Sequence, residues 1–358
     1  MATSPFEDYY RILGVHRHAE PEVIAFVETH QIRRPGVTGP LFVASARHRD
    51  GWSVARNPDG SCVFFDRGGG RLCEIHRAVG ASALPSACRH FPRRILRDRR
   101  GTFISLSHFC PTAALMLLGA DSLSLVEAEP PLRLDEPVEG LDAVDALPPL
   151  VRPGLLCDLE GYSAWELAGL ATFARPDLTC QQALALIASA TERVREWRPG
   201  TCTMAEHVEQ AFRSSSACSG RAQPDAHAHA IEMVITLCAG RVPDDIMPID
   251  GFDAAWTQHA AVPFERFDRA MKNYLAARLF ASWIAYQGRG LRSNVAWLHT
   301  AAAVVRHQFL RRVQGATAPP GPDDFIEAVR RADLLLLHVV DTQEFAHLVA
   351  PIEGLEPA

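Results

Sequence analysis

Four cysteines constrain this chain more than any other feature, because four thiolates brought together form a complete ligand set for a metal. Cys62, Cys73, Cys88 and Cys110 are separated by ten, fourteen and twenty-one residues, and none of them belongs to a CxxC pair. Glycine or proline stands close to each one. We therefore expect each cysteine in a turn or at the end of a strand, where the four side chains can converge on one point.

Zinc and an iron–sulfur cluster are the two candidate occupants, since both accept four thiolates. Structural zinc sites usually draw their ligands in closely spaced pairs, because two tight turns position them in advance. Ligands from four separate loops instead suit a larger group, such as a cubane cluster. The spacing therefore favours a [4Fe–4S] cluster modestly and keeps Zn²⁺ as the alternative.

The composition is that of an ordinary globular protein, with 47% apolar and 22% charged residues among 358. A net charge of −6 argues against general binding of nucleic acid, which needs a basic surface. The count of nine cysteines is odd, and no signal-like or membrane-spanning apolar run is present. We expect a cytoplasmic protein without a membrane segment, in which clustered thiols bind metal rather than form disulfides.

The pattern along the chain predicts an α+β protein in two parts. Residues 1–120 are expected to form a small mixed cysteine-rich module, residues 121–155 a Pro-rich connection, and residues 156–358 a mainly α-helical domain. Alternating apolar residues predict short antiparallel strands at 41–47, 52–56 and 62–65, and a hairpin turning near 99–101. Residues 1–35 are expected to be helical, with Pro21 at a helix start. Helical spacing of apolar residues predicts further helices near 112–118, 179–197, 204–213, 225–239, 264–286, 291–313 and 323–349. Ser163 and Glu166 have the spacing of a capping box, which predicts a helix start at that point.

The segment around the cysteines resembles a known family. Its motif comprises Cys62, Leu72-Cys73-Glu-Ile-His76, Gly80, Leu84-Pro85, Cys88-Arg89, Phe91-Pro92-Arg93, Ser105-Leu106 and Cys110-Pro111. This ordered series is similar to the cysteine-cluster family of putative zinc- or iron-chelating proteins, and more narrowly to flagellin lysine-N-methylase. A later segment, 271–280, resembles a helix in the second half of that methylase.

The resemblance implies a [4Fe–4S] cluster held by the four cysteines and S-adenosylmethionine as methyl donor to a lysine of a protein substrate, flagellin-like, in a bacterial cytoplasm. Members of the family commonly carry a further cysteine group upstream, whereas no cysteine precedes Cys62 here. The resemblance therefore supports binding of the cluster more strongly than it supports methyl transfer. Neither a GxGxxG after a strand nor the CxxxCxxC of radical enzymes is present. The sequence names no catalytic residue, and a non-enzymatic adaptor or sensor that binds zinc or an iron–sulfur cluster stays open as the alternative.

Basic residues beside the cysteines are candidates for supporting roles. His76 could donate a hydrogen bond to a cysteine sulfur or carry a proton, or it could be a packed turn residue. Arg89, Arg93 and Arg94 could offset the negative charge of a thiolate-bound cluster, or bind a carboxylate or phosphate. Alternatively, these arginines form a solvated face of a chain in which Lys272 is the only lysine.

Two groups in the helical half have weaker interpretations. His207, His227, His229 and Cys238 could form a second metal site, although two histidines in a His-x-His pair point to different faces of a helix. We expect them to be ordinary core or surface residues. The aromatic residues Tyr274, Phe280, Trp283 and Tyr286 are expected to pack in the core, with a substrate groove as the alternative.

Overall fold

The computed structural model describes residues 18–19, 21–32, 38–44, 52–55, 57, 62–65, 73–119, 121–128, 140–216, 226–238 and 246–353. Within them the protein is mixed, with many helices and a few short strands in small sheets. The chain divides into two compact units, Met1–Phe91 and Pro92–Ala358.

The first unit is a small sheet covered by short helices. Its elements are β1 (His18–Ala19), α2 (Pro21–Thr29), β2 (Phe42–Ala44), β3 (Trp52–Val54), α3 (Glu74–Val79), a 3-10 turn (Ala81–Ala83) and α4 (Ser86–His90). Strand β3 lies in the middle and pairs antiparallel with β1 and β2. The predicted pairing of the first two strands is confirmed, with Phe42 opposite Val54. The turn predicted at residues 50–51 lies outside the described residues.

One local prediction in this unit is wrong. Residues 62–65 form a turn instead of a strand, and Phe65 at its end makes an isolated bridge to Cys73. The amide of Phe65 donates to the carbonyl of Cys62 at 3.0 Å, which closes the turn. The side chains of Val63 and Phe64 are both buried in the core. In a strand, two neighbouring side chains would point to opposite faces, so the turn allows both to be buried.

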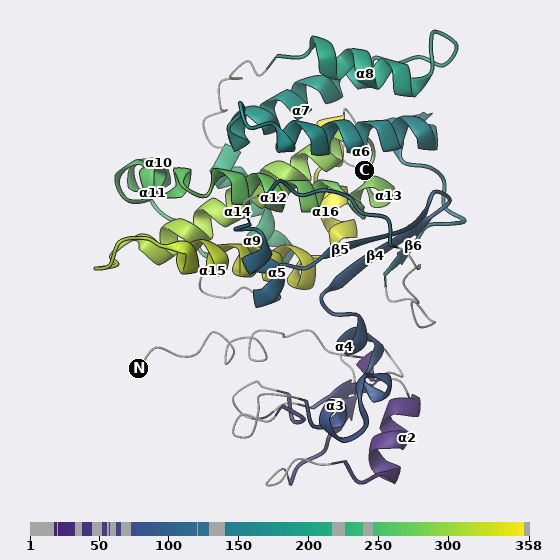
Figure 1. Ribbon diagram of the computed structural model, residues 1–358, viewed down its shortest axis with the longest axis vertical. Helices are drawn as coiled ribbons and strands as arrows, with labels where there is room; N and C mark the ends of the chain where they lie inside the picture. The colour runs from purple at the N-terminus through teal and green to yellow at the C-terminus, as the bar shows by residue number, and fades with distance from the viewer. Residues whose placement is uncertain are drawn as a thin grey trace. The chain divides into compact units, whose positions relative to one another are not determined.

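The second unit begins with strands and continues into helices. Its strands are β4 (Arg93–Asp98), β5 (Gly101–Leu106), β6 (Leu141–Asp142), β7 (Leu150–Arg152) and β8 (Leu155–Leu156). Strand β4 pairs antiparallel with β5 and parallel with β6 (Figure 1). Strands β7 and β8 form a separate hairpin. The hairpin predicted near 99–101 is confirmed, since Asp98 lies opposite Gly101.

The helices of this unit share one large core. They are α5 (Pro111–Met116), α6 (Leu159–Ala174), α7 (Cys180–Arg195), α8 (Met204–Ser214), α9 (Ala226–Cys238), α10 (Phe252–Ala255), α11 (Ala261–Glu265), α12 (Asp268–Leu279), α13 (Ile284–Gln287), α14 (Leu291–Val313), α15 (Pro322–Asp333) and α16 (Thr342–Leu348), with π-helical segments at Trp256–Ala260 and Leu334–Val339 and a closing 3-10 turn at Ala350–Glu353. Helices α6, α7 and α8 pack against one another, and α14 packs against α7, α9, α12 and α15 (Figure 1).

The division between the units falls at Phe91 and Pro92, whereas the sequence suggested a connection over residues 121–155. The β4–β5 hairpin belongs with the helices for a physical reason. Leu96 of β4 packs in a cluster with Ala143 and Ala281. Residues 121–128 also pack with the helical unit. The amide of Leu123 donates to the side chain of Asn273 at 2.9 Å.

One helix start and one helix break differ from the predicted ones. Helix α6 begins at Leu159, because Asp158 caps it by accepting from the amide of Gly161. The capping box predicted at Ser163 and Glu166 is therefore wrong, and both residues lie inside the helix. The single helix predicted over 264–286 is broken between α12 and α13, where Ala281 has a φ of 52° and its amide donates to Glu166 at 3.1 Å.

Candidate functional site

Three of the four predicted metal ligands lie against the core of the first unit. Cys62 opens the turn that Phe65 closes, Cys73 is the N-cap of α3, and Cys88 lies within α4. All three are partly buried and pack against the same cluster, which includes Phe64 and Ile75. The sequence prediction that each cysteine lies in a turn or at the end of an element holds for Cys62 and Cys73, while Cys88 is in a short helix.

The fourth predicted ligand, Cys110, belongs to the second unit. It is the N-cap of α5, with Pro111 at the first helical position as expected. Its amide donates to the carbonyl of Ser107 at 3.3 Å, and its own carbonyl accepts from Ala114 at 2.9 Å. Its side chain makes no capping hydrogen bond, so the thiol is not used to hold the helix start.

Within the described ranges, no three His, Cys, Asp or Glu side chains form a group that could hold a metal ion. The stretches 58–61 and 66–72, beside Cys62 and Cys73, lie outside those ranges. The donor set itself fits a thiophilic metal, because partly buried cysteines from a turn, a helix start and a short helix pack against one core. The four-cysteine site stays a prediction.

The supporting residues fall in different places. His76 is exposed on α3, Arg89 is half-buried on α4, and Arg93 is exposed at the start of β4 in the second unit. His90, which the sequence did not single out, is 5% exposed, and its Nδ1 has no hydrogen-bond partner among the described residues. Its position two residues beyond Cys88 was its only sequence signal.

The histidines and the cysteine considered as an alternative metal site do not form a metal-binding group in the described part of the helical unit. The ring of His227 stacks on Phe252 with centroids 3.5 Å apart, and His229 is exposed. His207 pairs through Nε2 with the carbonyl of Arg193 at 2.9 Å, while Cys238 is buried in the core. These residues are core and surface residues, as the preferred interpretation had it.

A buried charge network that the sequence did not reveal lies in the second unit, centred on Asp333 of α15. Its carboxylate accepts from the hydroxyl of Tyr274 at 2.8 Å and from the amide of His108 at 2.5 Å. The Nη1 of Arg278 lies 3.6 Å from it. Burial alone would raise the pKa of Asp333, but Arg278, His108 and Tyr274 together lower it below its ordinary value. Asp333 is thus held as a carboxylate inside the protein.

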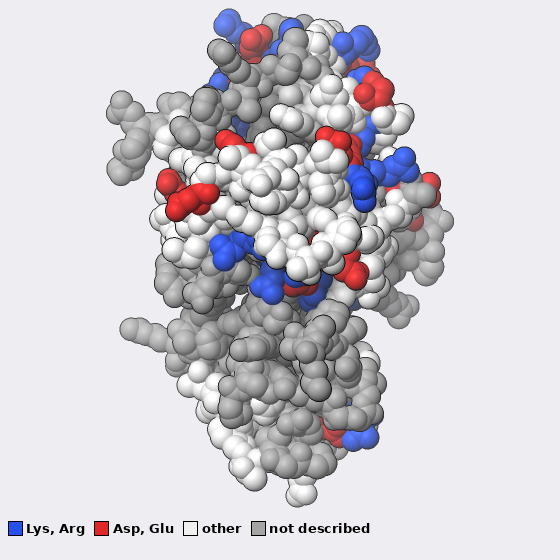
Figure 2. Space-filling view, turned by 90° about the vertical axis from the view of Figure 1, so that its left-hand side faces the viewer, with Lys and Arg blue, Asp and Glu red and all other residues white. Residues whose placement is uncertain are grey.

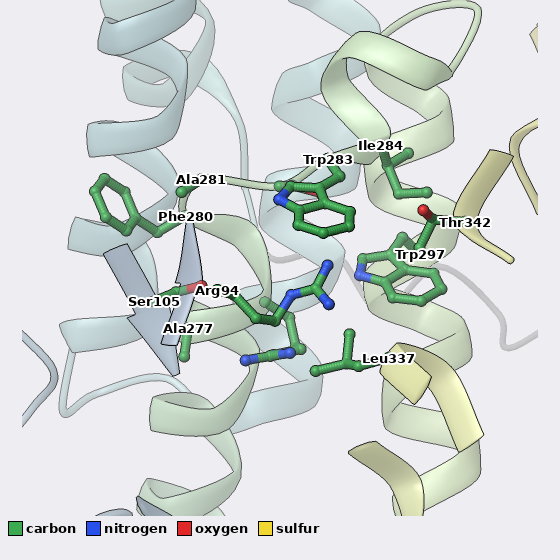
Figure 3. Close-up of a pocket in the computed structure, with 12 residues that line it drawn as sticks. Arg94, Ser105, Ala277, Phe280, Ala281, Trp283, Ile284, Trp297, Leu337 and Thr342 are labelled. Atoms are coloured by element: carbon green, nitrogen blue, oxygen red, sulfur yellow. The ribbon is translucent and has the colours of Figure 1, made fainter. Parts of the chain in front are cut away.

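Beside this network lies a small pocket that is partly open to solvent and has room for about one water molecule. Arg94 of β4 reaches into it beneath the ring of Trp283, and Trp297 of α14 forms part of its wall (Figure 3). The guanidinium carbon of Arg94 lies 4.1 Å from the centroid of the Trp283 ring. Of the predicted aromatic group, Phe280 and Trp283 line this pocket, whereas Tyr274 is fully buried.

The other lining residues come from elements far apart in the sequence. They are Ser105, Ala277, Arg278, Ala281, Ser282, Ile284, Leu337 and Thr342. The pocket therefore combines two guanidinium groups and several hydroxyl groups with apolar walls.

The surface of the protein carries charges of both signs. On the face drawn in Figure 2, Lys and Arg side chains lie next to Asp and Glu side chains, with uncharged residues over much of the area between. No helix in the part of the chain that the structure describes is long and apolar enough to cross a membrane.

Comparison with models of protein families, with curated proteins and with solved structures finds no match to this chain in any of the three.

Proposed function

We propose that this protein binds a [4Fe–4S] cluster through Cys62, Cys73, Cys88 and Cys110. The observation that carries the proposal is the packing of Cys62, Cys73 and Cys88 against one small core, each from a different turn or helix. The position of Cys110 in front of α5, with a side chain that does not cap the helix, leaves its sulfur available as a ligand. A bound cluster would offer redox chemistry or a Lewis-acid iron to a ligand.

The proposed activity is transfer of a methyl group from S-adenosylmethionine to a lysine of a partner protein, and it rests on the resemblance of the cysteine segment to flagellin lysine-N-methylase. In that reaction the bond between the sulfonium sulfur and the methyl carbon breaks as a bond from the lysine nitrogen forms. The ammonium must first lose a proton to become a nucleophile, and S-adenosylhomocysteine leaves.

A non-enzymatic adaptor or sensor is the second candidate. It is favoured by the absence of any residue with an assigned catalytic role and by the donor set, which Zn²⁺ would also accept. In that case the metal would stabilise the first unit, against whose core Cys62, Cys73 and Cys88 pack.

Anaerobic purification followed by metal analysis tests the first proposal. We expect a brown protein with broad visible absorbance and with iron and acid-labile sulfide in equal amounts. A colourless protein with stoichiometric zinc would refute the iron–sulfur assignment.

Methyl transfer is tested separately on cluster-loaded protein. Calorimetric titration with S-adenosylmethionine should show binding, and mass spectrometry of a lysine-bearing partner such as flagellin should show added methyl groups. Loaded protein that does not bind the donor would leave the adaptor as the function.

A further inference from the structure

The turn in front of α5 is held by side chains from distant helices. Each of the four residues before Cys110 is bonded to one of them, in the pairs Leu106 with Arg278, Ser107 with His338, His108 with Asp333, and Phe109 with Arg330. These partners belong to α12, to α15 and to the π-helical segment that follows α15. The chain is therefore fixed to the helices at every step on the way to the fourth predicted ligand.

These bonds lie inside the protein. The distances are 2.9 Å between the Oγ of Ser107 and the Nε2 of His338, 2.5 Å between the amide of His108 and the Oδ2 of Asp333, and 3.2 Å between the Nε of Arg330 and the carbonyl of Phe109. Ser107, His108 and Phe109 are 1%, 3% and 2% exposed. A polar group buried at this depth is costly to the fold when its partner is withdrawn, so the turn resists opening.

Asp333 is the centre of these contacts, because both of its carboxylate oxygens are in use. Its Oδ1 accepts from the hydroxyl of Tyr274 at 2.8 Å, and its Oδ2 accepts from the amide of His108. The Nη1 of Arg278 lies 3.6 Å from Oδ1, and the Nη2 of the same guanidinium donates to the carbonyl of Leu106. The buried network thus binds the chain before Cys110 twice, through Asp333 and through Arg278.

Cys110 is also fixed from the side of the helix that follows it. Its amide donates to the carbonyl of Ser107 at 3.3 Å, which closes the turn, and Pro111 begins α5 directly after it. Helix α5 packs against α15, which carries Asp333 and Arg330. The thiol itself is partly exposed and makes no capping bond. A ligand whose backbone is already in place loses less conformational freedom when it binds a metal.

We propose that Asp333, Arg330 and His338 are positioning residues that hold the turn at residues 107–110, so that Cys110 presents its thiol before the cluster binds. This role rests on the proposed function, because it takes Cys110 as a ligand. The three residues act on the cluster through Cys110, so their loss should weaken cluster binding only while that cysteine is present. This condition separates positioning of the ligand from general support of the fold.

The rate at which a ferrous chelator removes iron from anaerobically loaded full-length protein tests this condition. Asp333→Asn has one acceptor oxygen where the carboxylate has two, so either Tyr274 or the amide of His108 loses its acceptor. Asp333→Asn and Cys110→Ala should each release iron roughly tenfold faster than the wild type. The double variant should be no faster than Cys110→Ala alone. Additive effects in the double variant, or a wild-type rate in Asp333→Asn, would refute the positioning role.

Hydrogen exchange of the metal-free protein reports on the turn directly. The peptide covering residues 106–116 should exchange roughly tenfold faster in Asp333→Asn than in the wild type, while the peptide covering α8 keeps its wild-type rate. An unchanged rate at 106–116 would overturn the proposal even if iron were lost. A wild type that binds neither iron nor zinc would instead refute the proposed function, and with it the ligand role of Cys110.

His338→Phe keeps the test valid if Asp333→Asn does not fold. His338 is partly exposed, and its ring packs against Phe109 with centroids 5.7 Å apart. A phenyl ring can keep that packing but cannot bond to Ser107. Exchange at 106–116 should therefore rise roughly fivefold, and a wild-type rate in this variant would contradict the hold on the turn.

Glu166→Gln is the matched control for both measurements. Glu166 is a buried carboxylate of the same unit, but it accepts from Arg100 and from the amide of Ala281, which lie outside the turn. This variant should lose stability and still release iron at the wild-type rate. Iron release from Glu166→Gln as fast as from Asp333→Asn would show that loss of stability, and not release of the turn, frees the iron.

Discussion

The guanidinium group of Arg100 donates from Nη1 to the carboxylate of Glu166 over a distance of 2.6 Å. The same guanidinium also donates to Asp98, which accepts a further hydrogen bond from the hydroxyl of Tyr286 at 2.6 Å. Glu166 in turn accepts from the amide of Ala281. One buried set of charges thus joins the β4–β5 hairpin, helix α6 and the connection between α12 and α13.

Removing one member of this buried pair is expected to destabilise the second unit strongly. Glu166→Gln should lower the free energy of unfolding by roughly 3 kcal/mol, because Arg100 would be left buried without one of its two carboxylates. The side chains of Arg100 and Glu166 are only 10% and 4% exposed. Urea unfolding followed by far-ultraviolet circular dichroism measures the loss.

The control for this change is an exposed pair in the same unit. Arg292 and Glu192 are 2.5 Å apart, with side chains 36% and 48% exposed. Glu192→Gln should cost no more than about 1 kcal/mol, as is typical of surface ion pairs. If both variants lost the same stability, burial of the Arg100–Glu166 pair would not be what makes it important.

The role of Glu166 also shows where sequence-based prediction stops. The periodicity of apolar residues predicted the helical half, because each helix buries a face that repeats along the sequence. The spacing of Ser163 and Glu166 satisfies a local capping rule, but Glu166 is used by Arg100 and Ala281, which are distant in sequence. The contact between Ala281 and Glu166 interrupts the helix without any local sequence pattern. One helix was therefore predicted where the structure has α12 and α13.

The two candidate sites also differ in how far the sequence alone could predict them. Pro111 allowed the helix start after Cys110 to be predicted, because a Pro at the first helical position is a local feature, whereas the helix that begins after Cys73 was not predicted. The arginine pocket draws on β4, β5, α12, α14 and α16. Its aromatic residues were assigned to the core from helical spacing, and only tertiary packing separates Trp283, which lines the pocket, from Tyr274, which does not.

Stability of the second unit is expected to fall as the pH is lowered from neutrality. Burial, together with His307 and Arg306, lowers the pKa of His227 from 6.5 to about 3. Between these two values the unfolded chain binds a proton that the folded protein excludes, so stability declines as pH falls below 6.5, by up to about 1.4 kcal/mol per pH unit. Burial also lowers the pKa of His108, which acts in the same direction.

The His227→Phe variant should flatten this dependence. A phenyl ring fits where the imidazole stacks on Phe252, and it carries no titrating group. The free energy of urea unfolding at several pH values between 7 and 5 provides the slope. His229→Phe is the control, because His229 is exposed on the same helix and its replacement should leave the slope unchanged. A His227→Phe slope equal to that of the wild type would contradict the assignment.

Two glycines on α6 are expected to respond differently to the same substitution. A Cβ at Gly161 would lie 2.5 Å from both Cβ and Cγ of Met204, at the point where α6 packs on α8. At Gly169 the nearest atom is the Cδ2 of Leu279, the end of a flexible side chain. Gly161→Ala should therefore lose about 1–3 kcal/mol of stability from overpacking, despite the better helix propensity of alanine.

Gly169→Ala is the comparison for that prediction. Leu279 can change rotamer to make room, so we expect the helix propensity of alanine to offset most of the cost. Melting temperatures of the two variants provide the measurement. A loss at Gly169 as large as that at Gly161 would show that side-chain flexibility at the contact does not decide the outcome.

Metal content should depend on Cys88 and not on Cys180. Cys88→Ala removes a proposed ligand from the core of the first unit, so we expect anaerobically purified protein to lose most of its metal and the first unit to become more sensitive to protease. Cys180 opens α7 in the second unit, where its amide donates to Asp268 and burial raises the pKa of its thiol. A thiol that resists ionisation is a poor ligand, because metals bind the thiolate. Cys180→Ala should therefore keep the metal content of the wild type, and equal loss of metal in the two variants would refute the assignment of Cys88 as a ligand.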